Sequence, residues 1–188
     1  MNAIGNWEKQ KTEEIRFAFG AISLGHMLVA VGAGGVTAIL IGDGRDALRR
    51  QLAGAFPQAE LIFDEAGLKE VVDRVSAYLE APDGDLDLPL DPRGSAVELA
   101  VWEALRAVPS GRTISYGEIA KKLPLPATAQ EVGAACAANR LAVAIPCHRV
   151  VKADGSISGY RWGVARKRRL IAREASAAPE ASAGAEAS

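Results

Sequence analysis

The chain has 188 residues, a formal net charge of -1 and 49% hydrophobic residues, enough apolar material for a core in one domain or two small ones. Its apolar runs fall far short of the roughly 20 residues of a membrane-spanning helix, and its polar N-terminus lacks the apolar centre of a signal peptide. The two cysteines, Cys136 and Cys147, argue against a disulfide framework. We therefore expect a soluble, cytoplasmic protein without membrane association.

Charge is divided unevenly along the chain. Residues 1–110 carry 17 acidic and 10 basic side chains, whereas residues 111–173 carry 12 basic and 3 acidic ones, including the run RKRR at 166–169. A solvated basic face and a nucleic-acid-binding surface both fit such a pattern. The second half of the chain is therefore the part expected to meet an anionic partner.

The first half predicts a small α/β domain over residues 14–80, preceded by a flexible lead-in over residues 1–13. Glycines punctuate β-branched and aromatic residues between 15 and 42, which is typical of short antiparallel strands. Apolar residues spaced three and four apart predict helices over 44–56 and 66–80.

Proline, glycine and aspartate mark two further features of this half. The stretch APDGDLDLPLDPRG at 81–94 interrupts both periodicities and predicts a linker. The glycines of GAGGVTAILIGDG, at 32–44, do not follow the order G-x-G-x-x-G, and no helix opens directly behind them. We therefore interpret them as turn glycines and not as a phosphate-binding loop.

Residues 95–174 predict a mainly helical second domain, followed by a disordered tail over 175–188 that has no large apolar side chain. A first helix spans 96–109. Two more begin at capping boxes, Ser115 with Glu118 and Thr128 with Glu131, and the prolines of LPLP separate them. In a basic domain this pattern fits either a helix-turn-helix or a plain helical hairpin.

The helix expected over 128–138, TAQEVGAACAA, has almost no bulky side chains. Helices that read base edges in the major groove usually present long polar side chains. A flat helix instead suits close approach to a sugar-phosphate backbone or a narrow groove, where it binds DNA by shape.

The stretch AIPCHRVV, at 144–151, holds a thiol beside an imidazole and a guanidinium. Cys147 needs a base or a positive environment to become strongly nucleophilic near neutral pH, and His148 and Arg149 are its neighbours. A Cys-His pair by itself is weak evidence for catalysis. Two histidines and two cysteines without a CxxC pair do not suggest a metal site, and Cys136 is expected to be a small buried residue.

IPCHRV at 145–150, preceded by ANRLAVA and followed by GSISGYRWGVARKRRLIAREA, resembles the signature of the O6-alkylguanine-DNA alkyltransferases, most closely the C-terminal half of bacterial Ada-type proteins. The resemblance runs from about residue 14 to 174. It implies an α/β N-terminal domain with a small antiparallel sheet and a helix-turn-helix, winged-helix-like domain that binds DNA and catalyses the transfer.

The family resemblance also implies an activity. The protein would bind double-stranded DNA through the minor groove, largely independently of sequence and as a monomer, without a cofactor. It would flip the damaged base out of the stack, because a base inside a duplex is out of reach. Cys147 would take the alkyl group from O6-alkylguanine, or from O4-alkylthymine, and would be consumed in one turnover.

Further roles are implied for residues that match the family's motif. His148 would be a water-linked base oriented by Glu174, and Tyr116 would help to rotate the base and protonate the departing guanine. The lesion pocket would be formed by Asn139, Val150, Tyr160 and Arg161. The DNA-binding residues would be Thr128, Gln130, Gly133, Ala134, Ala137 and Arg149. Simpler roles exist: Tyr116 packs between helices, Asn139 caps a helix, or Glu174 is a solvated acid.

One position departs from the family pattern. The family usually has an arginine nine residues before the asparagine, where this chain has Gln130. Glutamine lacks the charge and the stacking plane of arginine, so we expect slower repair of duplex DNA and a smaller deficit on single strands. A lesion-binding protein with little transfer, a regulatory fragment and a thiol hydrolase are the alternatives. The absence of cysteine before residue 136 argues against the zinc-cysteine regulatory module of Ada-type proteins.

Overall fold

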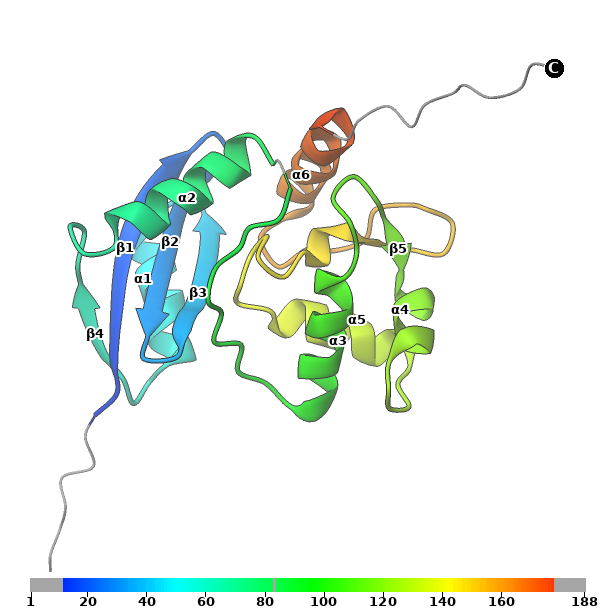
Figure 1. The fold of residues 1–188 in the computed structure, drawn as a ribbon, viewed down its shortest axis with the longest axis horizontal. Coiled ribbons are helices and arrows are strands. Elements are labelled where there is room, and N and C mark those ends of the chain that lie inside the picture. The colour runs from blue at the N-terminus through cyan, green and yellow to red at the C-terminus, as the bar shows by residue number, and fades with distance from the viewer. Residues whose placement is uncertain (1–11, 83, 178–188) are drawn as a thin grey trace, which may run out of the picture.

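The computed structural model describes residues 12–82 and 84–177, which form two packed halves (Figure 1). The N-terminal half is a four-stranded sheet with two helices, and the C-terminal half is mainly helical. Residues 84–94 run between them. Within the described residues, no helix is long and apolar enough to cross a membrane.

The N-terminal sheet has the strand order β3-β2-β1-β4. Its strands are β1 (Glu14–Ile22), β2 (Gly25–Gly32), β3 (Gly35–Gly42) and β4 (Glu60–Phe63). The first three are antiparallel neighbours, as predicted, whereas β4 lies parallel to β1. The sheet is therefore mixed. The sequence did not predict β4, because four residues with a half-exposed pattern carry little periodicity.

Two helices cover this sheet from opposite faces. In Figure 1, α2 (Lys69–Glu80) lies in front of β1 and β2, and α1 (Arg45–Ala55) lies behind the sheet. The predicted bounds of α1 are confirmed within one residue at each end. Helix α2 begins three residues later than predicted, because the Asp64 carboxylate accepts a hydrogen bond from the Gly67 amide at 2.8 Å and holds a turn there.

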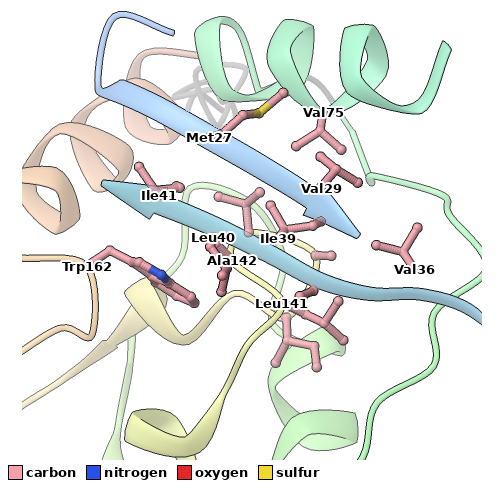
Figure 2. Packing of buried hydrophobic residues seen from close by; sticks show 14 of the residues in the cluster. Met27, Val29, Val36, Ile39, Leu40, Ile41, Val75, Leu141, Ala142 and Trp162 are labelled. Atoms are coloured by element: carbon pink, nitrogen blue, oxygen red, sulfur yellow. The ribbon is translucent and has the colours of Figure 1, made fainter. Parts of the chain in front are cut away.

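Strand β3 is an edge strand, and the rest of the chain covers its edge. The Ile39 amide donates to the Arg140 carbonyl at 2.8 Å, and the Ala142 amide donates to the Ile39 carbonyl at 3.0 Å. Figure 2 shows Leu141 and Ala142 lying beside Ile39. The sheet thus fixes the segment that leads to the cysteine motif.

The linker also pairs with β3 and is not a free connection. The Val36 amide donates to the Pro89 carbonyl at 2.7 Å, and the Asp91 amide donates to the Val36 carbonyl at 2.9 Å. Gly35, at a φ of +128°, lies so close that an added Cβ would be 2.3 Å from the Pro89 carbonyl oxygen. A glycine is therefore required at this turn for both conformation and space.

The C-terminal half consists of short elements that converge on the cysteine motif. They are α3 (Ala96–Arg106), β5 (Ile114–Ser115), α4 (Tyr116–Lys122), α5 (Ala129–Ala138), the 3-10 turn η1 (Cys147–Arg149), β6 (Val150–Val151) and α6 (Val164–Ala177). Both predicted capping boxes are present, at Ser115 and at Thr128. The two-residue parallel pair β5–β6 places Ser115 next to Val151, so the start of α4 lies beside the motif.

Three predicted boundaries need correction. Helix α3 ends at Arg106 and not at 109, because the residue before Pro109 is forced out of the helical region. Helix α6 continues through Ala177, so residues 175–177 of the predicted tail are helical. Glu13 of the predicted lead-in is held by an ion pair with Arg93. The rest of the lead-in up to residue 11, and the tail from 178, lie outside the described residues.

Candidate active site

The cysteine motif follows a tightly folded segment at 139–147. The Ala144 amide donates to the Ala142 carbonyl at 2.7 Å, and the Ile145 amide donates to the Leu141 carbonyl at 3.0 Å. Val143 between them has a φ of +59°, a conformation that β-branched residues rarely adopt. Surrounding hydrogen bonds and burial keep this strained residue in place, so the turn delivers Cys147 in a fixed position.

Cys147 is only 3% exposed and contacts the residue that ends α5. The Asn139 side-chain amide donates to the Cys147 sulfur at 3.1 Å and to the Ile145 carbonyl at 3.0 Å, and its oxygen accepts from the Leu141 amide at 2.8 Å. Burial raises the pKa of the Cys147 thiol to about 11, although the Asn139 hydrogen bond and the Lys167 charge oppose that shift. The thiol is therefore protonated at rest, and its reaction requires a proton acceptor.

His148 and Glu174 meet in the interior. The Nε2 atom of His148 lies 2.7 Å from Oε1 of Glu174, and both side chains are almost fully buried. Burial lowers the pKa of His148, while the Glu174 carboxylate acts in the opposite direction. Burial opposes ionisation of Glu174, but hydrogen bonds from His148 and Arg149 outweigh it and lower the pKa of Glu174 to about 2. A neutral imidazole held by an ionised carboxylate is an arrangement suited to accepting a proton.

Arg149 was predicted to bind DNA, and this prediction is wrong. Its guanidinium is 3% exposed and donates to both Glu174 oxygens at 2.9 to 3.2 Å, and to the Val108 carbonyl at 2.5 Å. A guanidinium committed to an internal carboxylate cannot also reach a phosphate. We call His148, Arg149 and Glu174 the buried charge cluster.

Two residues missed by sequence reasoning connect Tyr116 to α6. The Tyr116 hydroxyl lies 2.5 Å from Oγ of Ser158, and the Lys167 ammonium lies 3.4 Å from both the Ser158 Oγ and the Gly159 carbonyl. Lys167 is fully buried, and burial lowers its pKa. Its position inside the RKRR run gave no sign of this burial, because such runs are usually solvated.

The other predicted pocket residues lie around the motif. Val150 is buried in β6, and the Tyr160 ring stands edge-on to His148 and to Trp162, with ring centroids 6.5 and 5.2 Å apart. Burial raises the pKa of Tyr160 well above its usual value, so its hydroxyl stays protonated. Arg161 is exposed and donates to the Ala137 carbonyl at 2.6 Å, which joins this loop to the end of α5.

Helix α5 presents a flat surface to solvent, as predicted. Gln130, Ala134 and Ala137 are exposed at helical spacing, and we call these three residues the outer face of α5. Thr128 caps the helix, and its backbone and hydroxyl both donate to the Glu131 carboxylate, which therefore turns back on the helix end. Gly133 is half-buried beside the Tyr116 ring.

The basic run at 166–169 is only partly available to a partner. Arg166 donates to the Leu24 and Trp162 carbonyls at 2.8 Å and pairs with Asp43, while Lys167 is buried. Arg168 and Arg169 are exposed. Among the described residues, no group of three or more histidine, cysteine, aspartate or glutamate side chains is arranged to hold a metal ion.

Known proteins are similar to this chain in both sequence and fold. Residues 96–176 match the family model described as 6-O-methylguanine DNA methyltransferase, DNA binding domain. The methylated-DNA–protein-cysteine methyltransferase of Mycobacterium tuberculosis H37Rv is 41% identical over 116 residues, which are 62% of this chain and 70% of that protein. The chain belongs to this methyltransferase family. The signature around Cys147 is thus accompanied by family similarity over most of the chain.

Longer relatives and solved structures extend the similarity. The bifunctional transcriptional activator/DNA repair enzyme Ada of Escherichia coli K12 is 45% identical over 161 residues, 86% of this chain. The chain spans 46% of that protein's length. The crystal structure of the M. tuberculosis O6-methylguanine methyltransferase superposes with a TM-score of 0.73 at 31% identity, covering 88% of this chain and 96% of that one. The crystal structure of M. tuberculosis OGT in complex with DNA superposes with a TM-score of 0.69 at 32% identity, covering 89% of this chain and 96% of that one.

Proposed function

We propose that this protein repairs DNA by transferring the alkyl group of O6-alkylguanine to Cys147. The observation that supports it most strongly is the combination of a buried thiol, fixed by Asn139, with the adjacent pair of His148 and Glu174. A buried nucleophile, an acceptor for its proton and a carboxylate that orients the acceptor are the components that a displacement by sulfur needs.

The route of the thiol proton follows from which ring nitrogen of His148 is already hydrogen-bonded to Glu174. Glu174 engages Nε2 of His148, so Nδ1 is the ring nitrogen that accepts the thiol proton, through a bridging water. The Cys147 sulfur then forms a bond to the alkyl carbon while the bond from that carbon to O6 breaks. The electron pair remains on guanine, which takes a proton from the Tyr116 hydroxyl. A thioether is a stable product, so one molecule of protein repairs one lesion.

DNA binding is assigned to the outer face of α5. Cys147 is almost fully buried, so a guanine in a stacked duplex cannot reach it and must be flipped out. Gln130, Ala134 and Ala137 allow close approach to the minor groove without reading base edges. A monomer acting on double-stranded DNA, largely independently of sequence, fits this surface.

Gln130 determines the rate of alkyl transfer that we expect on duplex DNA. It is the one long side chain on the outer face of α5, where it is exposed and in position to enter the groove. An amide fills the gap left by a flipped base less well than a guanidinium does. We therefore propose that transfer is complete but slowed on duplex DNA. A lesion-binding protein with little transfer is the second candidate, and Gln130, in place of the family's arginine, is the observation that favours it.

The experiment measures the conversion of O6-methylguanine to guanine in the DNA. Protein is mixed with a severalfold molar excess of duplex that carries one O6-methylguanine, and the bases are separated and quantified over time. Wild-type protein should convert the lesion to guanine, one lesion per protein molecule. Cys147→Ala should leave the lesion intact while still binding the duplex, and Cys136→Ala should repair like the wild type. Binding without conversion by the wild type would support the lesion-binding candidate instead, and conversion of many lesions per molecule would contradict a single-use acceptor.

A further inference from the structure

His148 and Glu174 belong to elements that are far apart in the chain. His148 lies in η1 and Glu174 lies 26 residues later in α6, yet their polar atoms are 2.7 Å apart. Contacts from outside the pair hold both elements at this separation. The last turn of α2, residues Tyr78–Glu80, contacts both elements.

The η1 side is held through Tyr78. The Tyr78 side chain is buried, and its hydroxyl accepts a hydrogen bond from Nη2 of Arg149 at 3.3 Å. Burial raises the pKa of Tyr78, so the hydroxyl remains intact at neutral pH. Arg149 uses its other donors on Glu174 and on the Val108 carbonyl. Tyr78 therefore helps to fix the guanidinium that braces the buried charge cluster.

The α6 side is held through Leu79 and Glu80. Arg173, the residue before Glu174, donates to the Leu79 carbonyl and lies 3.5 Å from the Glu80 carboxylate. It also donates to the Ser23 hydroxyl at 2.5 Å, and Glu80 accepts from the Ser23 amide at 2.6 Å. The C-terminal end of a helix carries partial negative charge, which favours a guanidinium at this position.

A second attachment lies two turns away on the same helix. Arg166, seven residues before Arg173, donates to the Leu24 carbonyl at 2.8 Å and pairs with Asp43. Both arginines thus reach the turn between β1 and β2, from one face of α6. Lys167, Leu170 and Glu174 are buried on the adjacent face. The helix is fixed along its length with Glu174 facing inward.

We propose that the last turn of α2, Tyr78–Glu80, is a positioning element for the transfer reaction, because it holds Arg149 and Arg173 so that Glu174 stays on His148. The N-terminal domain thereby contributes to the chemistry through Arg149 and Arg173. This inference rests on the proposed function of Cys147 and His148.

The proposal predicts a particular pH dependence. The charged and titratable groups that face His148 are Glu174 and Lys167 of α6, Arg149 of η1 and Tyr160 of the loop before α6. Glu174 is the group that strengthens the imidazole as a base, so loosening it weakens proton removal from Cys147. Hydroxide takes over that task as the pH rises toward the thiol pKa of about 11. The deficit should be greatest near neutral pH and shrink in alkali.

The test compares Arg173→Ala, Tyr78→Phe and, as a matched control, Arg50→Ala at an exposed position of α1. The single-turnover rate of methyl transfer is measured with saturating protein from about pH 6 to about pH 10, well below the unfolding temperature. Arg173→Ala should be roughly tenfold slower than wild type near pH 7 and approach it near pH 10. Tyr78→Phe, which removes one hydroxyl, should be roughly threefold slower near pH 7, and Arg50→Ala should match the wild type.

A second readout needs neither DNA nor transfer. The chain has two histidines, so the His148 ring can be followed by NMR titration of the unbound protein. Arg173→Ala and Tyr78→Phe should both lower the pKa of His148 relative to the wild type. Wild-type rates and an unchanged His148 titration in both variants, or a rate deficit that is equal at every pH, would overturn the proposal. Failure of the wild type to transfer methyl would instead refute the proposed function, and the titration would still decide whether the turn positions Glu174.

Discussion

The outer face of α5 and the buried charge cluster differ in how far their side chains are exposed and in how many hydrogen bonds those side chains make. The side chains of Gln130, Ala134 and Ala137 are exposed to solvent, whereas Arg149 and Glu174 are buried and joined by several hydrogen bonds. An exposed alanine can be replaced at little cost to folding, but a buried ion stripped of its partner destabilises the whole protein. The outer face of α5 can therefore change through single substitutions, while the residues around the thiol are tied to stability.

The largest effect separating these two regions is expected from Glu174→Ala. The substitution leaves Arg149 and His148 buried without their acceptor, which should lower the free energy of unfolding by about 3 to 5 kcal/mol. Chemical denaturation of the variant and of Glu103→Ala, an exposed acid on α3, provides the measurement and its control. A loss below about 1 kcal/mol for Glu174→Ala would mean that the cluster does not couple chemistry to stability.

Lowering the pH should also show that Glu174 contributes to the stability of the fold. The folded-state pKa of Glu174 is about 2, below the value of 4.5 that the carboxyl has when unperturbed. Its contribution to stability is thus fully present above about pH 4.5 and is lost as the pH falls toward 2. The shift corresponds to about 3 kcal/mol. Urea unfolding at about pH 3 and about pH 6 should show a smaller pH-dependent loss in Glu174→Gln than in the wild type, and equal losses would contradict the assignment.

The outer face of α5 should respond in rate and not in stability. Gln130→Arg places a guanidinium at an exposed position, so it should change the free energy of unfolding by less than about 0.5 kcal/mol. It should accelerate methyl transfer from duplex DNA by roughly tenfold, with little change on single strands, where no stacked partner must be replaced. Equal rates of methyl transfer from duplex DNA in the variant and the wild type would show that Gln130 does not limit the reaction.

The smallest expected effect lies at the start of α5. Thr128→Ala removes the side chain that accepts from the Glu131 amide at 3.2 Å, which should cost about 1 kcal/mol of stability. Thr128→Ser, which keeps the hydroxyl, is the matched control. Thermal unfolding of both variants makes the comparison, and an unchanged midpoint for Thr128→Ala would show that the cap is dispensable.

Local features of the C-terminal half could be predicted from the sequence. The capping boxes at Ser115 and Thr128 act within four residues, so the pattern alone located both helices. The flat outer face of α5 followed from its alanines in the same way. The fold class and the family were also confirmed, because the motif around Cys147 is specific and the similarity extends through both halves.

Contacts between distant residues could not be predicted. Arg149 follows the motif like a DNA-binding arginine, but its partner Glu174 lies 25 residues away, and only the folded chain buries both. Lys167 lies in a basic run and is nevertheless buried against Ser158. The strained φ of Val143 has no signature in an aliphatic run. In each case tertiary packing, which local pattern does not encode, decides the role of the residue.

Whether Cys147 is the single acceptor can be read from the mass of the peptide that contains it. Protein is incubated with a slight excess of duplex carrying one O6-methylguanine, digested, and analysed by mass spectrometry. We expect one added methyl group on the Cys147 peptide, none on the Cys136 peptide, and none on either with undamaged duplex. A Cys147 peptide of unchanged mass after the lesion has been bound, or a methyl group on Cys136 instead, would contradict it.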